Sequence, residues 1–144
     1  MLEATGPDLT AAQLYAILRL RGEVFVVEQE CVYADIDGRD LLPTTRHLWL
    51  ADPAGGVTAY LRVLADPDGV SRIGRVVTAA SARGQGLAAS LMEAALADAP
   101  GEFVLDSQTY AQSLYARFGF VAEGDEFLDD GIPHITMRRA AGKS

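Results

Sequence analysis

The stretch that decides the fold runs from Val76 to Ala99 and reads VVTAASARGQGLAASLMEAALADA. An apolar, strand-like run opens it, the segment RGQGLA (83–88) follows, and an amphipathic, helix-like segment closes it. Gly84 and Gly86 can adopt positive φ and let a ligand approach the main chain, while the free amides and positive dipole end of a following helix attract anions. With Arg83 beside them, these glycines predict an anion site, and an ordinary strand-to-helix turn is the alternative interpretation.

Two common phosphate-binding motifs do not fit this stretch. A P-loop needs a lysine directly after its second glycine, and the only lysine in the chain is Lys143. A Rossmann fingerprint needs a third glycine where this chain has Ala89, and it opens a βαβ unit, whereas three strand-like segments come first here. Nucleotide hydrolysis through a P-loop and Rossmann-type dinucleotide binding are therefore not predicted.

The residues before this stretch predict one helix and a meander of strands. Thr10 and Gln13 have the spacing of a capping box, and apolar residues at helical period predict a helix over 10–22. Residues 30–45 show no period and are expected to form a loop. Apolar or alternating segments separated by short turn signals predict consecutive antiparallel strands. These strands are expected over 47–51, 57–64 and 70–78.

The residues after it predict an alternation of helices and strands. The helix that follows RGQGLA is expected to end at Ala99-Pro100-Gly101, and a second helix is expected to be closed by Gly119. Further strands are expected over 103–105, 121–126 and 134–138. The order of elements predicts an α+β or α/β fold, with a mixed sheet and helices in one domain over residues 1–144.

The composition indicates an acidic globular domain. Its net charge of -8 argues against general attraction to nucleic-acid phosphates and makes small cationic molecules, such as amines, natural partners. No apolar run approaches the ~18 residues of a membrane span, and the acidic N-terminus has no signal-peptide pattern, so a soluble cytoplasmic protein is expected. The single cysteine, Cys31, excludes an internal disulfide and is expected to be a buried structural residue.

Two motifs resemble hallmarks of the GCN5-related N-acetyltransferase (GNAT) superfamily. RGQGLA (83–88) resembles its R/Q-x-x-G-x-G/A signature, whose loop binds the coenzyme A pyrophosphate, with Ala88 where many members have glycine. LYARFGF (114–120) is similar to the second hallmark, a leucine-tyrosine pair followed by glycine-phenylalanine. A narrower similarity to the ElaA-type branch covers residues 18–29, 35–38, 46–48 and 130–135.

The resemblance implies an α/β (α+β) fold with a mixed, mostly antiparallel, twisted sheet of six to seven strands flanked by about four helices. It also implies an N-acetyltransferase that uses acetyl-CoA as co-substrate and acetylates a primary amine by direct attack in a ternary complex. The cofactor-binding residues that it implies are Val76, Val77, Thr78, Arg83, Gly84, Gln85, Gly86, Leu87, Ala88, Gln108 and Tyr115.

Tyr115 is the first candidate catalytic residue. The resemblance implies that its hydroxyl faces the coenzyme sulfur and protonates the departing thiolate. Gln108 precedes Tyr115 by a spacing of two helical turns, so the two side chains are predicted to project from nearly the same helix face. Periodicity alone favours a core aromatic at Tyr115, and the surrounding motif reverses that preference.

A base or a water chain is also expected, because a primary amine with its usual pKa of about 10 is mostly charged at pH 7. The conceivable groups are Glu28, Asp35, Asp37, His47, Asp106 and His134. His134 is the favoured candidate because it follows a Gly-Ile-Pro turn and imidazole titrates in the useful range, although a lone histidine is more often structural. Asp35 and Asp37 do not have calcium-loop spacing and are expected to face solvent or a cationic substrate, so no metal site is predicted.

Several alternatives stay open at this point. A non-catalytic acyl-CoA-binding sensor or interaction module of the same fold is the alternative function, and a longer acyl donor is a third reading. The sequence identifies neither the amine nor the oligomeric state, a homodimer included.

Overall fold

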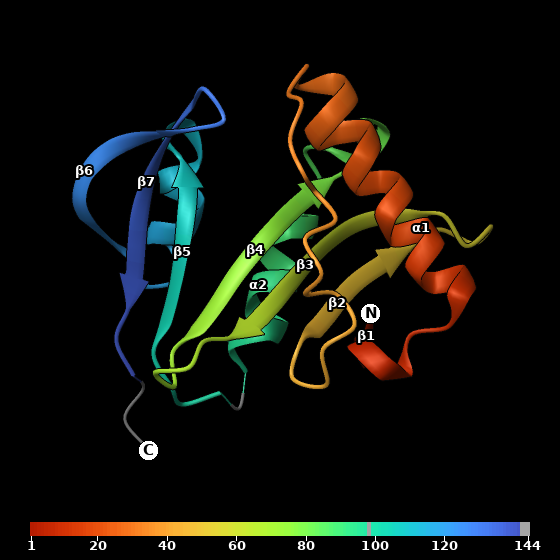
Figure 1. Cartoon of the computed structure of the whole chain (residues 1–144), viewed down its shortest axis with the longest axis horizontal. Coiled ribbons are helices and arrows are strands. Elements are labelled where there is room, and N and C mark those ends of the chain that lie inside the picture. Colours follow the sequence, from red (N-terminus) through yellow and green to blue (C-terminus); the bar gives the residue numbers. More distant parts are fainter. Residues whose placement is uncertain (98, 142–144) are drawn as a thin grey trace.

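The computed structural model describes residues 1–97 and 99–141, and in this part of the chain seven strands form one sheet (Figure 1). The order across the sheet is β1-β2-β3-β4-β5-β7-β6. The strands are β1 (Leu2–Thr5), β2 (Arg46–Ala51), β3 (Val57–Ala65), β4 (Ser71–Thr78), β5 (Phe103–Gln108), β6 (Val121–Asp129) and β7 (Ile132–Arg139). Neighbouring strands are antiparallel except β4 and β5, which are parallel. This mixed, mostly antiparallel sheet confirms the predicted fold class.

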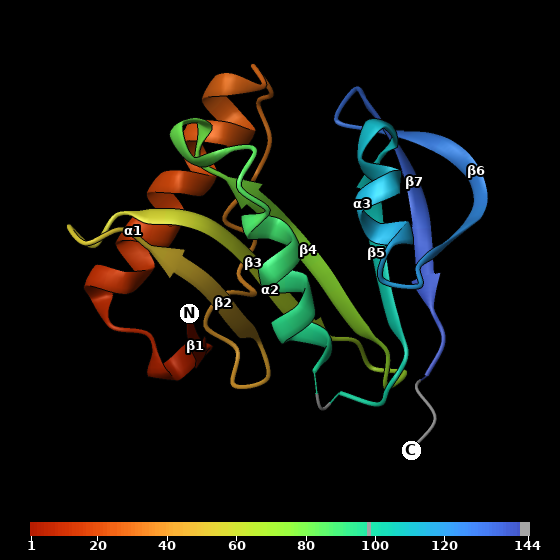
Figure 2. The ribbon, with the colours of Figure 1, turned by 180° about the vertical axis from the view of Figure 1, so that it is seen from behind.

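Helices cover both faces of the sheet. Helix α1 (Ala11–Arg21) lies on one face, and α2 (Leu87–Leu96) and α3 (Gln112–Ala116) lie on the other (Figures 1 and 2). Because side chains alternate along a strand, the neighbours Tyr60 and Leu61 on β3 enter the core under α1 and the core under α2, respectively. No helix in the described residues is long and apolar enough to cross a membrane.

Helix α1 matches the predicted range, and the chain stays helical beyond it. The capping box is complete, since the Gln13 amide donates to Thr10 Oγ1 (3.1 Å) and the Thr10 amide donates to Gln13 Oε1 (3.0 Å). Gly22 keeps right-handed helical angles, so the chain continues without a break into a π-helical segment, η2 (Gly22–Glu28). The described residues contain three α-helices and this π-helical segment, in agreement with the about four helices expected. The remaining helical segments are the short 3-10 turns η1 (Gly6–Asp8), η3 (Ala80–Ala82) and η4 (Thr109–Ala111).

The meander β2–β3–β4 confirms the predicted antiparallel order, while other strands are longer than predicted or were missed. Strand β1 was not predicted, because its short, mixed sequence has no alternation. Strand β5 extends past the predicted 103–105 to Gln108, which pairs with His134 on β7. The polar end of β5 is therefore supported by its neighbour in the sheet and not by an apolar pattern of its own.

The seam between β4 and β5 is the feature that positions the site. Among the described residues these strands pair only at Ser71 with Phe103 and Arg72 with Val104, and they diverge afterwards. The edge of β4 beyond Arg72 therefore faces β5 without a ladder partner. Backbone amides and carbonyls on such an edge stay available to a ligand.

A β-bulge interrupts β4 along this open edge. Tyr60 pairs with Val77 and Arg62 pairs with Gly74, so a single β3 residue lies opposite the two β4 residues Arg75 and Val76. Arg75 has a φ of 54°, in the left-handed region that non-glycine residues rarely adopt. A bulge leaves one residue of the strand unpaired and re-aims its neighbours.

Candidate functional site

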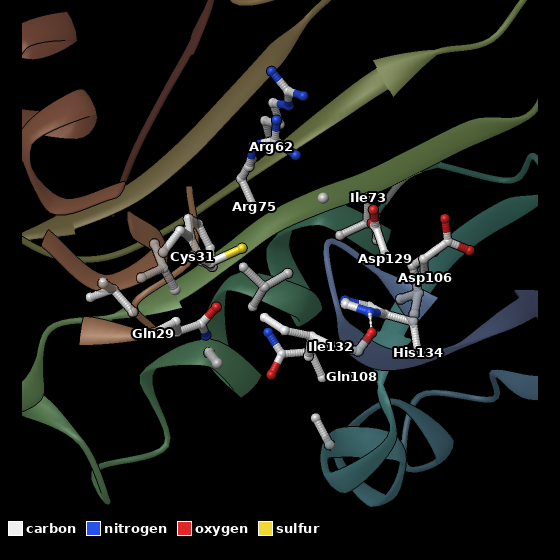
Figure 3. Close-up of a pocket in the computed structure, with 18 of the residues that line it drawn as sticks. Gln29, Cys31, Arg62, Ile73, Arg75, Asp106, Gln108, Asp129, Ile132 and His134 are labelled. Carbon is white, nitrogen blue, oxygen red and sulfur yellow. Dashed lines mark hydrogen bonds between the residues drawn. The ribbon is translucent and has the colours of Figure 1, made fainter. Parts of the chain in front are cut away.

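A cavity of about 680 Å³ opens where β4 and β5 diverge. Its walls come from the second half of β4, the end of β5, the π-helical segment, the loop after that segment, the β6–β7 turn and α3. Figure 3 shows Cys31 on the loop, Gln108 on β5 and His134 on β7 approaching the cavity from different elements. Polar side chains that lie far apart in the sequence therefore line the same cavity.

A smaller cavity of about 160 Å³ adjoins it at the start of α2. Both are lined by Thr78, Arg83, Ala88 and Leu114, so the small cavity extends the large one. Gly84 and Gly86 have φ values of 82° and 72°, which confirms the predicted left-handed glycines. In the described residues no side chain caps the start of α2, so its first amides are free to bind an anion.

The predicted cofactor residues divide between these cavities. The strand residues Val76, Val77 and Thr78 line the large cavity, as do Gln108 and Tyr115. The loop residues lining the small cavity are Arg83, Gly84, Gly86, Leu87 and Ala88. Gln85, between the two glycines, lines neither cavity.

The helical spacing proposed for Gln108 and Tyr115 is wrong, although both residues line the cavity. Gln108 is the last residue of β5, and Tyr115 lies on α3. The chain turns between them through η4 (Thr109–Ala111), so no helix face is shared. The two side chains reach the same cavity because the chain turns between strand and helix. The prediction had assumed one continuous helix of two turns.

Arg83 contacts two other segments of the protein. Its Nη2 lies 2.8 Å from Glu28 at the end of the π-helical segment, and its Nε donates to the Thr78 carbonyl at 3.3 Å. Both side chains of the ion pair are roughly half exposed. This solvent-accessible pair links the wall of the large cavity to the glycine loop.

Tyr115 has the environment of a protonated phenol. The residue is buried, and its ring meets Phe120 edge-on at 6.3 Å between centroids. Burial raises the pKa of Tyr115 to about 12, because the phenolate would lose its hydration. The hydroxyl therefore stays protonated at neutral pH and can donate a hydrogen bond or its proton.

The two histidines differ in what they can do. His134 lines the cavity, and its Nδ1 donates to the Ile132 carbonyl at 2.7 Å, which leaves Nε2 with a lone pair (Figure 3). Its ring also stacks on Phe127. His47 is fully buried outside both cavities, where Nε2 donates to the Asp40 carbonyl (2.7 Å) and Nδ1 accepts from the Tyr60 hydroxyl (2.6 Å). Burial lowers the pKa of His47, so this residue is a neutral structural group.

The acidic loop does not face solvent or a free cation as expected. Asp35 and Asp40 are buried and bind Arg21, whose Nε lies 3.0 Å from Asp35 and whose Nη1 lies 2.6 Å from Asp40. Asp37 lines the cavity but accepts a hydrogen bond from Arg62 Nη1 at 2.9 Å. The carboxylates are already neutralised by arginines of α1 and β3. The sequence analysis did not identify Arg21 and Arg62 as partners of these carboxylates. The available signal was the place of Arg62 within a strand pattern of otherwise mostly buried residues.

Two other residues with proposed roles lie on the cavity wall. Asp106 accepts a hydrogen bond from Thr136 Oγ1 at 2.8 Å and lies 3.5 Å from Arg72. Cys31, expected to be buried, is only half-buried, and its thiol lies 3.6 Å from the Asp130 carbonyl. The loop after the π-helical segment places Cys31 against the β6–β7 turn and not in a core.

Comparisons with known proteins agree with this geometry. Residues 7–141 match the family model of the acetyltransferase (GNAT) domain. The chain is similar to a UPF0039 protein of Mycobacterium tuberculosis, with 53% identity over 92% of this chain and 87% of that protein. Among solved structures, it is similar to an acyl-CoA N-acyltransferase of Pseudomonas aeruginosa (TM-score 0.90, 45% identity, 96% of this chain and 98% of the other). It is also similar to Escherichia coli ElaA (TM-score 0.88, 35% identity, 96% and 97%).

Proposed function

The chain belongs to the GNAT acetyltransferase family, and we propose that it transfers an acetyl group from acetyl-CoA to a primary amine. The observation that carries this proposal is the joined pair of cavities, with an uncapped helix start at one end and a polar pocket at the other. An elongated anionic thioester fits such a site, because its phosphates, its amide-containing arm and its reactive end require different surroundings.

The donor end is held mainly by the main chain. The pyrophosphate would accept hydrogen bonds from the amides at the start of α2, where Gly84 and Gly86 leave room for close approach and Arg83 adds a positive charge. The pantetheine arm would pair with the open edge of β4 at Val76 to Thr78, as an added strand pairs with a sheet edge. Acetyl-CoA supplies the activated acyl group, and this chain supplies position and charge stabilisation.

Tyr115 would serve the departing sulfur. A thiol has a pKa of about 8.5, so complete proton transfer from a phenol with a pKa of about 12 is uphill by ~5 kcal/mol. The main contribution of Tyr115 is therefore a hydrogen bond that strengthens as negative charge develops on sulfur. Such bonds to charged groups are worth ~1.5–3 kcal/mol. If the proton of Tyr115 moves completely to the sulfur, Tyr115 acts as a general acid.

His134 would prepare the amine for attack. Its Nδ1 is occupied by the Ile132 carbonyl, so Nε2 is the atom that can accept a proton, directly or through water. Asp106 lines the same cavity and is the carboxylate alternative, although it already binds Thr136 and Arg72. His47 and the buried carboxylates of the acidic loop are withdrawn from this role by their partners.

The test is a thiol-release assay with acetyl-CoA and a panel of primary amines, diamines and amino-terminal peptides. Tyr115→Phe is expected to lower kcat by about 10- to 150-fold, the equivalent of one charged hydrogen bond, and to leave acetyl-CoA affinity within about 3-fold. Tyr15→Phe, at an exposed position on α1, is the matched control and should behave as wild type. Acetyl-CoA binding without amine-dependent thiol release would instead favour the sensor alternative. Parallel assays with longer acyl-CoA donors identify the preferred acyl group.

A further inference from the structure

The bulged residue of β4, Arg75, has an unusual backbone conformation, and its side chain contacts a neighbouring loop. Arg75 has a φ of 54°, and left-handed angles are unfavourable for residues with a Cβ. No glycine takes this place in the sequence. Such a conformation persists only when the surrounding structure determines it, and here the Arg75 side chain makes a specific set of contacts.

These contacts join Arg75 to the loop that follows the π-helical segment. Arg75 Nε lies 2.8 Å from Asp35 Oδ1 in an ion pair that does not have hydrogen-bond geometry, and Nη2 donates to the Asp35 carbonyl at 3.1 Å. The guanidinium also lies over the ring of Tyr33, at 5.4 Å from its centroid. Arg75 thus contacts Asp35 through both its carboxylate and its carbonyl, and its Nη2 also lies 3.6 Å from Asp37 Oδ2.

Asp35 is a fixed anchor, because a second arginine and a tyrosine hold it from other directions. Arg21 on α1 is fully buried and donates to Asp35 Oδ2 (3.0 Å) and to the Asp35 carbonyl (2.8 Å). The Tyr33 hydroxyl donates to Asp35 Oδ1 at 2.7 Å. A chain of contacts therefore runs from the core under α1, through Asp35, to the bulge in the cavity wall.

We propose that Arg75 is a positioning residue that fixes the bulge of β4 so that a backbone amide there polarises the thioester carbonyl. Arg75 and Val76 both line the large cavity, and the bulge lies on the strand edge that has no partner beyond Arg72. An unpaired amide at such a place donates to an oxygen that gains negative charge, and its effect depends on a fixed direction. This role rests on the proposed acyl transfer, for which the family resemblance already implies a strand amide that stabilises the oxyanion, and it adds the side chain that fixes that amide.

The test uses Arg75→Gly, which removes the side-chain contacts while glycine accepts positive φ without strain. The probe is acetyl-CoA with a 13C-labelled carbonyl, read by isotope-edited infrared spectroscopy, which needs no amine. Wild-type protein is expected to lower the carbonyl stretching frequency of the bound thioester, and Arg75→Gly to lose most of that shift. CoA, which lacks the carbonyl, should bind both proteins with Kd values within about 3-fold.

Turnover and two further variants make the readout specific. With an active amine, kcat of Arg75→Gly is expected to fall by about 100-fold, the scale of losing one oxyanion donor, with little change in KM. Asp35→Asn weakens the same contacts from the loop side and should reproduce the spectral change, and Arg75→Lys, which keeps a cation near Asp35, should recover part of it. Arg46→Ala removes an arginine–carboxylate pair outside both cavities and should leave the spectrum unchanged.

The outcomes separate this inference from the proposed function. An unshifted carbonyl in wild-type protein, or a wild-type carbonyl frequency in both Arg75→Gly and Asp35→Asn, overturns the positioning role. A carbonyl shift that depends on Arg75 without turnover of any amine supports the positioning role and rejects acetyl transfer to the amines tested.

Discussion

Arg21→Met is expected to be among the most destabilising single substitutions in this chain. Arg21 is fully buried and makes three hydrogen bonds to Asp35 and Asp40, at 2.6–3.0 Å. Methionine retains most of the length and apolar stem but none of the donors. Removing one partner of a buried ion pair costs ~3–5 kcal/mol, because the remaining carboxylates stay desolvated. For a domain of this size each kcal/mol lowers Tm by roughly 2–4 °C, so a fall of about 6–20 °C is expected.

Arg19→Met provides the matched control. Arg19 lies on the same helix and pairs with Glu23, but both side chains are mostly exposed. An exposed pair of this spacing is worth ~0.3–0.5 kcal/mol, which lowers Tm by under about 2 °C. Thermal and urea unfolding followed by circular dichroism measure both variants. Equal Tm values for Arg21→Met and Arg19→Met would refute the reasoning that desolvated carboxylates dominate the cost.

The pH dependence gives a second check on the same substitution. Burial alone would raise the pKa of Asp40, but hydrogen bonds from Arg21 and the nearby Arg62 outweigh it and hold the pKa below its ordinary value. A carboxyl with a lowered pKa stabilises the fold above the pKa of the unfolded chain, and this contribution is lost as pH falls. The difference between wild type and Arg21→Met should therefore be largest at neutral pH and narrow below about pH 4. The double variant Arg21→Met/Asp40→Asn should be less destabilised than the sum of the two single variants.

Three further predictions concern the cavities. Gly86→Ala places a Cβ at a φ of 72° and is expected to weaken CoA binding by about 10-fold in calorimetry, whereas unchanged affinity would exclude the glycine loop from the site. Glu28→Gln frees Arg83 from its exposed ion pair and should tighten CoA binding by about 2- to 5-fold at low salt, an effect that high salt should remove. His134→Gln should abolish the rise of kcat/KM with pH that a base at Nε2 produces, and an unaltered pH profile would assign the base elsewhere.

Local patterns in the sequence predicted the elements that local forces determine. The capping box at Thr10 and the left-handed glycines at 84 and 86 depend on a few neighbouring residues, and both are present in the structure. The β2–β3–β4 meander follows from alternation and short turns in the same way. The family motifs then placed the loop and Tyr115 on the walls of adjoining cavities.

The features that sequence patterns missed depend on contacts between distant segments. Asp35 and Asp37 were expected to face solvent or a cationic substrate, because nothing nearby in the sequence shows that Arg21 and Arg62 reach them. The left-handed angle of Arg75 has no local signal either, since a positive φ is usually predicted from glycine or asparagine. In both cases the residues form ion pairs with partners that are far away in the sequence, which local patterns do not show.

The open seam between β4 and β5 also bears on how such a domain can diverge. The proposed recognition through the edge of β4 would use main-chain groups, which every residue except proline provides, so residues 76–78 could change while donor binding is retained. Side chains elsewhere on the cavity wall that have no proposed catalytic role, such as Asp129 and Ile132, could vary separately. A library randomised at the latter positions should therefore yield proteins that keep the same acyl donor and differ in the amine they accept. The divergence of β4 and β5 would thus allow the acceptor specificity to change during evolution while the donor specificity stays the same.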